Sequence, residues 1–189
     1  MEQQSSAPVV SYDDEPLILV DENDNVLGHE SKVVCHQGQG QLHRAFSIFV
    51  FNRNNELLLQ QRSGQKPLWP LYWSNSCCSH PRRGEGDLES AQRRVQEELS
   101  ISPKLEFLYR FRYHAPFGNV GAEHELCSVY IARCDAPVDV NVNEVADWSY
   151  IPAETLDQEL AANPELYTPW LKLEWPRIRN EFWSRLKSV

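Results

Sequence analysis

The hydrophobic positions of this chain fall mostly into short runs of β-branched and aromatic residues, bounded by polar turn signals. Runs of this kind are typical of strands. Polar residues 52–55 separate two adjacent runs and predict a hairpin. We expect strands at residues 17–21, 26–32, 45–51, 56–61, 105–113, 123–133 and 145–151, and an extended segment at 73–78.

One run alternates with special regularity. Residues 105–113 carry an aromatic side chain at every second position, namely Phe107, Tyr109, Phe111 and Tyr113. Successive side chains of a strand point to opposite faces, so the four rings are expected on one side.

Three segments have the spacing or the start signals of helices. Residues 87–99 begin at Asp87, a plausible N-cap, and place an apolar face at Leu88, Ala91, Val95 and Leu99. Residues 152–162 begin with proline at the first helical position. A last helix is expected from Thr168, with an interruption at Pro176. Many antiparallel strands with three helices predict an α+β fold.

Length and composition indicate one folded domain. The chain has 189 residues, of which 41% are hydrophobic and 24% charged. We expect a disordered lead-in at residues 1–15, which are polar and acidic, and a single domain at 16–189. No apolar run approaches the roughly 18–20 residues of a membrane span. The short N-terminus predicts neither a secretory signal nor an organelle-targeting extension.

Charge and cysteine content narrow the function classes. A net charge of −9 argues against nucleic acid as a partner, because binding to phosphates needs a basic surface. The five cysteines are an odd number, which favours a reducing compartment, here the cytoplasm.

A thiol and an imidazole lie two residues apart at Cys78 and His80, in a stretch of small polar residues that follows Trp73. Such a pair can ligate a metal, or it can act as a nucleophile or proton carrier beside a cation. Basic residues are dense near this stretch. As a group they suggest a small phosphorylated ligand, although for most of them individually solvated surface charge is the favoured interpretation: Arg62, Lys66, Arg82, Arg83, Arg93 and Arg94.

Further candidate ligands occur in two places. His36 and His43 flank a glycine-containing loop and could converge, although each alone is more often a surface or core histidine. Glu123 and Glu125 share one face of a predicted strand. If that face is buried, the pair needs a cation or must share a proton. If it is solvated, His124 points inward instead, and the alternation does not decide between the two.

The segment from Ser79 to Ile101 resembles a degenerate Nudix box, a loop–helix–loop whose glutamates hold a divalent cation against a diphosphate. Four residues fit the pattern: Glu85, Arg93, Glu97 and Glu98. Both glycines are replaced, by Ser79 and Ser100, and the glutamate after the arginine is Arg94. The resemblance therefore supports the fold more than phosphohydrolase activity.

Four separated motifs carry a second resemblance, at residues 35–36 with 42–47, at 73–81, at 123–127 and at 143–147. In this order they resemble the type I, flavin-independent isopentenyl-diphosphate isomerases of the Nudix superfamily, over about residues 17–186. The resemblance implies a mixed or antiparallel sheet flanked by helices as an α/β/α sandwich. It also implies interconversion of isopentenyl and dimethylallyl diphosphate in isoprenoid precursor biosynthesis, without flavin.

The resemblance also implies ligands and cofactors. It assigns a metal site to His36, His43, His80, Glu123 and Glu125, a mixture that suits Zn²⁺ or Mn²⁺ better than Mg²⁺. It assigns Mg²⁺, bound to the substrate diphosphate, to Glu98 and the backbone carbonyl of Cys78. Basic residues expected around the diphosphate are Lys32, Arg62, Lys66 and Arg94.

The implied chemistry moves a double bond through a tertiary carbocation-like state. Cys78 and Glu125 match the two groups that exchange protons with the substrate, and Tyr113 matches a tyrosine beside the glutamate. Trp170 matches a ring that lies over the substrate, where a π-face stabilises a cation and excludes water. Cys77 has no assigned role.

Two other functions compete with this one. A Nudix diphosphohydrolase is disfavoured by Arg94 and the missing glycines. A catalytically silent metal-binding module is disfavoured by the presence of both Cys78 and Glu125. The expected partner is a small diphosphate, with neither nucleic acid nor membrane, and the expected state is a monomer or weak homodimer.

Overall fold

Strand β3 (His43–Phe51) is apolar from Ala45 onward except at Ser47, because both of its faces are covered. In the computed structural model, which describes residues 7–187, Phe49 and Phe51 pack on one face against two C-terminal helices. Phe46, Ile48 and Val50 pack on the other face against a central helix. The run that predicted a strand at 45–51 is therefore the middle layer of three.

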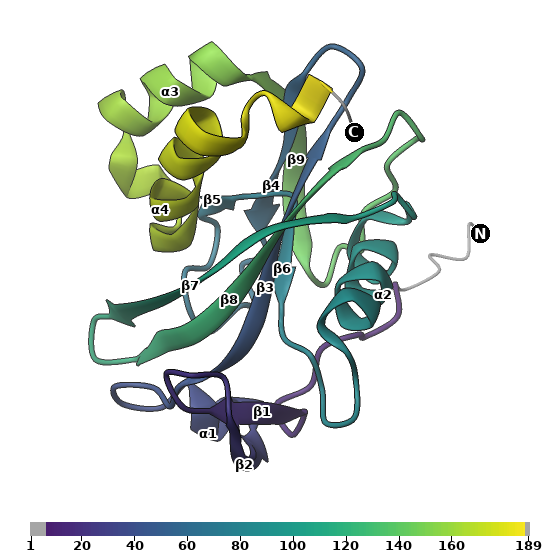
Figure 1. Ribbon diagram of the computed structural model, residues 1–189. Coiled ribbons are helices and arrows are strands. Elements are labelled where there is room, and N and C mark those ends of the chain that lie inside the picture. The colour runs from purple at the N-terminus through teal and green to yellow at the C-terminus, as the bar shows by residue number, and fades with distance from the viewer. Residues whose placement is uncertain (1–6, 188–189) are drawn as a thin grey trace, which may run out of the picture.

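The sheet around β3 is mixed (Figure 1). β8 (Gly121–Arg133) pairs in parallel with the whole length of β3, from His43 opposite Glu125 to Phe51 opposite Arg133. β7 (Glu106–Phe117) is antiparallel to β8. The remaining strands pair antiparallel on the other side of β3 or on its flanks: β1 (Pro16–Val20), β2 (Val26–Ser31), β4 (Glu56–Arg62), β5 (Trp73–Ser74), β6 (Cys77–Ser79) and β9 (Val145–Pro152).

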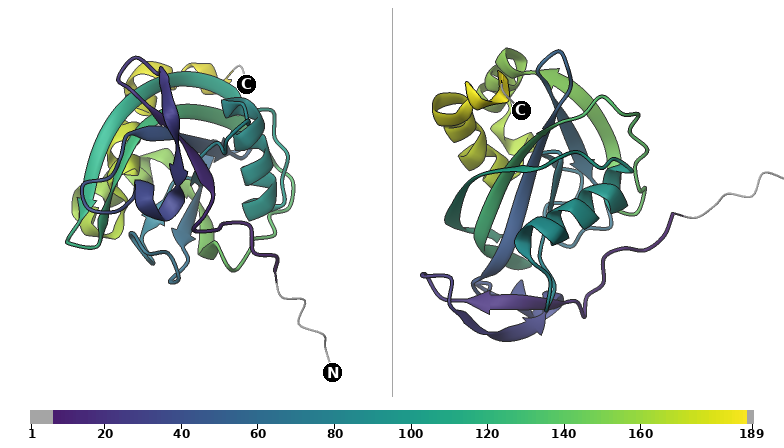
Figure 2. Two further views of the ribbon diagram at one scale, coloured as in Figure 1. Left: turned by 90° about the horizontal axis from the view of Figure 1, so that it is seen from below. Right: turned by 45° about the vertical axis from the view of Figure 1, so that its right-hand side comes forward.

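Helices cover both faces of this sheet (Figures 1 and 2). α2 (Asp87–Leu99) lies on one face, and α3 (Ala153–Ala162) and α4 (Pro169–Arg177) lie on the other. A 3₁₀ turn (Pro164–Leu166) joins α3 to α4, a π turn (Ile178–Phe182) follows α4, and a 3₁₀ turn (Arg185–Lys187) comes last. The prediction of an α+β sandwich is confirmed. None of the helices within residues 7–187 is long and apolar enough to cross a bilayer.

Four local predictions are corrected. Pro176 does not interrupt its helix, which runs to Arg177 and passes into the π turn; near a helix end, proline removes only one late hydrogen bond. A β-bulge between Phe107 and Tyr109 turns Phe107 outward, where it is 48% exposed, while Tyr109 stays buried. Leu88 is 45% exposed because its turn extends beyond the core cluster that covers Val95. Lys32 begins a short helix, α1 (Lys32–Cys35), instead of ending a strand.

The N-terminal segment packs against the domain from residue 7 onward, passing beside α2 (Figure 2). The Val10 carbonyl oxygen accepts hydrogen bonds from Arg82 at 2.9 Å and from Arg94 at 2.7 Å. The Pro8 carbonyl accepts one from Asn141 at 2.8 Å. For residues 7–15 the prediction of a disordered lead-in is therefore wrong, and residues 1–6 lie outside the described part of the chain.

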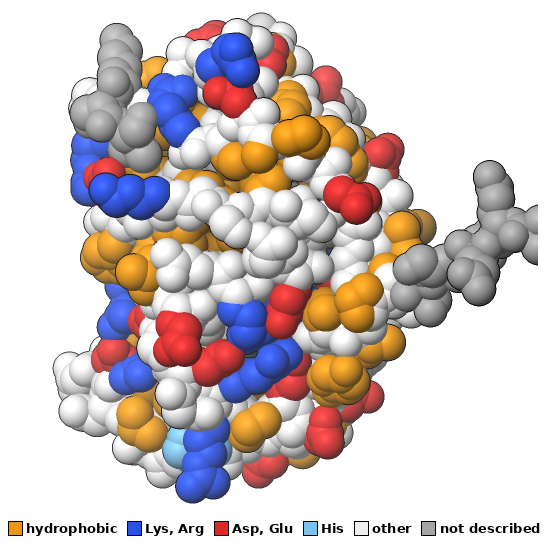
Figure 3. All heavy atoms as spheres, turned by 90° about the vertical axis from the view of Figure 1, so that its right-hand side faces the viewer, with side chains coloured by type: hydrophobic (Ala, Val, Ile, Leu, Met, Phe, Trp, Pro, Cys, Tyr) orange, Lys and Arg blue, Asp and Glu red, His pale blue; other side chains and the backbone are white. Residues whose placement is uncertain are grey.

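The face of the molecule that carries α2 mixes basic and acidic side chains (Figure 3). Ion pairs account for part of this mixture. Arg93 bonds to Glu85 at 2.7 Å and, one helical turn further on, to Glu97 at 2.9 Å.

Candidate active site

Three imidazoles and two carboxylates meet at one end of the parallel β3–β8 pair. His36 follows α1, His43 opens β3, and His80 follows β6. Their ligand atoms and those of Glu123 and Glu125 all lie within 4.8 Å of one another. The convergence considered for His36 and His43 is therefore real, with ring centroids 4.9 Å apart.

The strand register explains why both glutamates face inward. β3 and β8 place His43 directly opposite Glu125, so the two side chains share a face. Glu123, two residues earlier, shares it too, and both carboxylates are buried. The open choice between a buried and a solvated pair is settled in favour of burial.

Backbone contacts aim the imidazoles at the centre of the cluster. The Nδ1 atom of His36 lies 2.7 Å from the Lys32 carbonyl oxygen, and that of His43 lies 2.7 Å from the Gln41 carbonyl oxygen. Ala122 N–H donates to the His36 carbonyl at 3.0 Å. Gly121 makes this approach possible, because a Cβ at that position would lie 2.3 Å from the His36 oxygen.

The cluster fits a divalent cation. Four of its buried atoms have no hydrogen-bond partner among residues 7–187: His36 Nε2, His43 Nε2, His80 Nδ1 and Glu123 Oε2. His36 Nε2 and Glu123 Oε2 approach to 2.8 Å as an ion pair, without the geometry of a hydrogen bond. Buried polar atoms without partners are costly, and metal coordination satisfies such atoms. Three nitrogens with two oxygens suit Zn²⁺ or Mn²⁺.

Burial and neighbouring charges shift the pKa values of the cluster in different directions. Burial, with the neighbouring His36, lowers the pKa of His43 to about 4. Burial, with His43, likewise lowers the pKa of His80 well below its ordinary value. Both rings are therefore neutral, which is the form that ligates metal. Burial and Glu123 raise the pKa of Glu125, whereas for Glu123 the effect of His36 outweighs burial and lowers the pKa.

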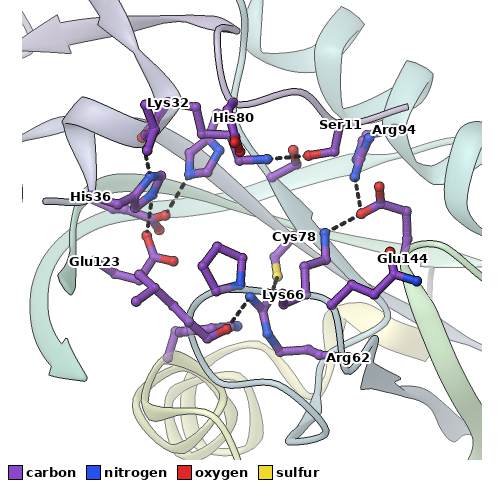
Figure 4. Close-up of a pocket in the computed structure, with 18 of the residues that line it drawn as sticks. Ser11, Lys32, His36, Arg62, Lys66, Cys78, His80, Arg94, Glu123 and Glu144 are labelled. Atoms are coloured by element: carbon purple, nitrogen blue, oxygen red, sulfur yellow. Dashed lines mark hydrogen bonds and ion pairs between the residues drawn. The ribbon is translucent and has the colours of Figure 1, made fainter. Parts of the chain in front are cut away.

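A pocket of about 300 Å³ opens beside the cluster (Figure 4). Most of the side chains singled out by the sequence line it: Lys32, His36, Arg62, Lys66, Cys78, His80, Arg94, Tyr113, Glu123, Glu125 and Trp170. Two do not line it. His43 is fully buried behind the other ligands, and Glu98 is buried behind Arg94.

The two adjacent cysteines face opposite sides of the sheet. In the β3–β6 ladder, Cys78 pairs with Ser47 on the pocket face, and Cys77 pairs with Ile48 in the core under α2. Burial raises the pKa of Cys78 to about 12, against an opposing effect of Arg62, whose Nη1 lies 3.9 Å from the sulfur. Cys78 is therefore a neutral thiol at the pocket wall.

A carboxyl–phenol pair lines the same pocket. Tyr113 and Glu125 are cross-strand neighbours, and the Tyr113 hydroxyl donates to Glu125 Oε2 at 2.7 Å. The Trp170 ring forms another wall, held by hydrogen bonds from its Nε1 to Ser74 Oγ at 2.9 Å and to Asn75 Oδ1 at 3.1 Å. The pocket thus places two proton carriers and an aromatic face around one space.

The basic end of the pocket is paired internally. Arg94 bonds to Glu98 at 2.7 Å and to Glu144 at 2.7 Å, and Lys66 also bonds to Glu144. Lys32 bonds to the Ser11 hydroxyl. The second oxygen of Glu98 accepts from Gln60 at 3.1 Å.

Sequence reasoning assigned no role to Glu144 or Ser47, which both line the pocket. Glu144 belongs to the motif at 143–147, and that motif was the only available signal. Its partner Arg94 is 50 residues away in the chain, and no local pattern predicts that contact. Ser47 likewise belongs to the motif at 42–47, in a strand that is otherwise apolar after Arg44.

Comparison with known proteins gives concordant results. Residues 41–171 match the model of the NUDIX domain. "Isopentenyl-diphosphate Delta-isomerase 1" of Photorhabdus laumondii is 42% identical, over 91% of this chain and 99% of the relative. "Isopentenyl-diphosphate Delta-isomerase" of Serratia proteamaculans is 45% identical, over 93% of this chain and 99% of the relative.

Solved structures show the same fold. The crystal structure of DR0079 from Deinococcus radiodurans aligns with a TM-score of 0.72 at 25% identity, over 86% of this chain and 98% of that one. A MutT protein from Methanosarcina mazei aligns with a TM-score of 0.62 at 16% identity, over 74% and 94% of the respective chains.

Proposed function

The chain belongs to the isopentenyl-diphosphate Delta-isomerases of the NUDIX family, and we propose that it interconverts isopentenyl and dimethylallyl diphosphate by proton transfer. One observation carries this mechanism. The neutral Cys78 thiol and the Glu125–Tyr113 pair line the same pocket, from different strands. Two proton-carrying groups in one pocket suit a double-bond shift, because a proton enters at one carbon and leaves from another.

The proposed steps balance as follows. In the forward direction, the π electrons of the C3=C4 bond take a proton at C4 and leave a tertiary cation at C3. A proton then leaves C2, and its electron pair forms the C2=C3 bond. Cys78 and Glu125 are the two exchanging groups, and the reverse reaction uses each in the opposite sense. Tyr113 relays a proton to or from Glu125 through its 2.7 Å hydrogen bond.

The walls of the pocket suit a short-lived cation. The Trp170 ring is held by two hydrogen bonds, so its π-face is fixed in position. A π-face attracts positive charge, and an aromatic wall excludes the water that would trap a carbocation. Trp69 meets Trp170 edge to face, with centroids 5.4 Å apart, and packs against that ring.

The basic end is proposed to bind the diphosphate through Lys32, Arg62, Lys66 and Arg94, which line the pocket together. Glu98 and the Cys78 carbonyl are proposed to hold the accompanying Mg²⁺, since carboxylate and carbonyl oxygens are hard ligands. For Glu98 this requires rearrangement, because both of its oxygens bond to Arg94 and Gln60.

The histidine–glutamate cluster is proposed to hold Zn²⁺ or Mn²⁺ through His36, His43, His80, Glu123 and Glu125. When bound, such a cation supplies positive charge that fixes Glu125 and sets its proton affinity. Because Glu125 also bonds to Tyr113, it joins this site to the acid–base pair.

We propose the cytoplasm as the location and a monomer or weak homodimer as the state, with a small diphosphate as the partner. All five cysteines are free within residues 7–187, which suits a reducing compartment. A diphosphohydrolase is the competing function. Arg94 bonds to Glu98 at the position where the hydrolase pattern carries a further glutamate, and this disfavours hydrolysis.

The test is direct. Purified protein with Mg²⁺ and either Mn²⁺ or Zn²⁺ should convert isopentenyl diphosphate into the acid-labile allylic isomer. Cys78→Ala should abolish turnover with metal content near wild type, and Cys77→Ala should keep substantial activity because Cys77 lies in the core. No product with either metal, or equal losses in the two variants, would contradict the proposal. Phosphate release from nucleoside diphosphate derivatives would favour the hydrolase.

A further inference from the structure

Glu174 is a fully buried carboxyl group, 0% exposed, to which no role has been given. It lies on α4 one turn after Trp170 and therefore faces the same side of the helix. Its Oε1 is 3.7 Å from the Cys127 sulfur. Its Oε2 has no hydrogen-bond partner among residues 7–187. Burying a carboxyl group costs free energy unless hydrogen bonds satisfy its oxygens, so the few partners of Glu174 need an explanation.

The groups around Glu174 lead to the pocket. The Cys127 thiol lies 3.5 Å from Ser47 Oγ, so its single proton has two possible acceptors, Ser47 and Glu174. Ser47 lines the pocket and is the cross-strand neighbour of Cys78 in the β3–β6 ladder. Cross-strand neighbours have Cβ atoms about 4.5–5.5 Å apart. Glu174, Cys127 and Ser47 thus form a polar layer directly behind the Cys78 thiol.

The charge state of Glu174 follows from what faces it. Cys127 faces it from β8, and from β7 the Tyr109 hydroxyl lies 3.5 Å from its backbone oxygen. The nearby cation Arg177 stacks on the Tyr109 ring, 3.9 Å from its centroid. Burial raises the pKa of Glu174 to about 8, although hydrogen bonds with Ser47 and Cys127 oppose it. At neutral pH the group is a carboxylic acid that can both donate and accept.

We propose that Glu174, as a neutral carboxylic acid, is a positioning residue for Cys78: it holds the Ser47 hydroxyl and the Cys127 thiol in one arrangement behind the Cys78 thiol. The inference rests on the proposed role of Cys78. Hydrogen bonds within a buried polar layer restrict the rotation of the side chains next to it, and loss of one partner leaves those side chains freer to rotate.

The test uses the reactivity of Cys78, which is measured without substrate. Iodoacetamide alkylation of wild type, Glu174→Gln, Glu174→Leu and Ser47→Ala is followed by peptide mass spectrometry at Cys78. Glutamine keeps both donor and acceptor, so Glu174→Gln should retain the wild-type alkylation rate and kcat. Glu174→Leu and Ser47→Ala should change both by about three- to tenfold, the effect of one lost hydrogen bond, with KM for the diphosphate unchanged. The double variant with Glu174→Leu and Ser47→Ala should show no further change in alkylation rate or kcat beyond that of either single variant.

Two results would overturn the inference. If Glu174→Leu and Ser47→Ala alkylate at the wild-type rate, Glu174 only fills space. If Glu174→Gln loses as much as Glu174→Leu, an ionised or proton-transferring carboxyl is required instead. Should Glu174→Leu fail to fold, the contrast between Glu174→Gln and Ser47→Ala still decides. Failure of the proposed function would show separately, as turnover by Cys78→Ala.

Discussion

The two charged ends of the pocket balance their charges in opposite ways. At the histidine–glutamate end, buried nitrogens and a carboxylate oxygen face one another without hydrogen-bond partners in the described chain. At the basic end, Arg94 bonds to both Glu98 and Glu144, and Lys66 shares Glu144. The first end can be completed by a cation from outside the chain. At the second, Arg94 and Lys66 already have carboxylate partners from the chain itself.

This difference determines what each end needs from a ligand. A cation entering the histidine–glutamate end meets groups that mostly contact one another, as in the His36–Glu123 ion pair at 2.8 Å and the His80–Glu125 contact at 3.0 Å. A diphosphate entering the basic end competes with Glu144 for Lys66 and Arg94. Metal affinity should therefore depend on how the ligands are held, and diphosphate affinity on how readily Glu144 gives up its cations.

The largest expected effect comes from removing one histidine ligand. His43→Ala should lower both metal content and activity by on the order of a hundredfold or more, because changes even to groups that orient ligands cost about 10–100-fold. Metal analysis after dialysis, beside an isomerase assay, measures this. His114→Ala is the matched control, since His114 is an exposed histidine that bonds to the Gln39 carbonyl outside the cluster. Retained metal in His43→Ala would remove that residue from the site.

The next effect tests how His36 is held. Gly121→Ala places a Cβ where the His36 carbonyl oxygen lies 2.3 Å away, so the backbone must shift and move the imidazole. We expect metal affinity to fall about ten- to hundredfold, as for other changes that misorient a ligand. Gly86→Ala is the control, because a Cβ there meets nothing within 4 Å. Equal metal affinities in the two variants would show that the close approach at Gly121 does not position His36.

A smaller effect of opposite sign is expected at the basic end. Glu144→Gln leaves Lys66 without its carboxylate partner and Arg94 with fewer, so inorganic diphosphate should bind about tenfold more tightly, or about 1.4 kcal/mol. The protein without diphosphate should unfold more easily, because a buried cation loses its partner. Calorimetric titration and thermal unfolding measure the two. Glu97→Gln serves as the control, because Glu97 is a more exposed partner of Arg94 and does not line the pocket. Weaker binding in Glu144→Gln would instead make Glu144 a ligand of the diphosphate-bound cation.

The sequence predicted the ligands better than it predicted this balance of charges. Period-two runs located the strands, and the motif around His80 pointed to the cluster. Alternation could not orient Glu123 and Glu125, because that depends on the parallel pairing of β3 with β8. It also could not show the bulge beside Tyr109, the role of Glu144, or the docking of Val10 on Arg94. Each of these is a contact between segments far apart in the chain.

The last prediction concerns the stability of the metal-free protein, where the smallest effects are expected. The contributions of Glu144 and Glu174 to the free energy of unfolding should change with pH in opposite directions. For Glu144, Lys66 and Arg94 outweigh burial and lower the pKa below 4.5. The contribution of Glu144 to the free energy of unfolding is present above pH 4.5 and is lost as the pH falls below that value. For Glu174, burial raises the pKa from 4.5 to about 8, so the neutral form is favoured in the fold. Its contribution is complete below pH 4.5 and is lost as pH rises toward 8.

Urea unfolding of wild type, Glu144→Gln and Glu174→Gln across this range separates the two. The histidine–glutamate cluster is intact in all three proteins, so each difference from wild type reports chiefly on the replaced glutamate. The advantage of wild type over Glu144→Gln should shrink as pH falls, and wild type should lose stability relative to Glu174→Gln as pH rises. Parallel curves for wild type and Glu174→Gln would mean that Glu174 is already ionised in the fold. A carboxyl group without a cation would then behave like one that has two, and the contrast between unpaired and internally paired charge would not govern this pocket.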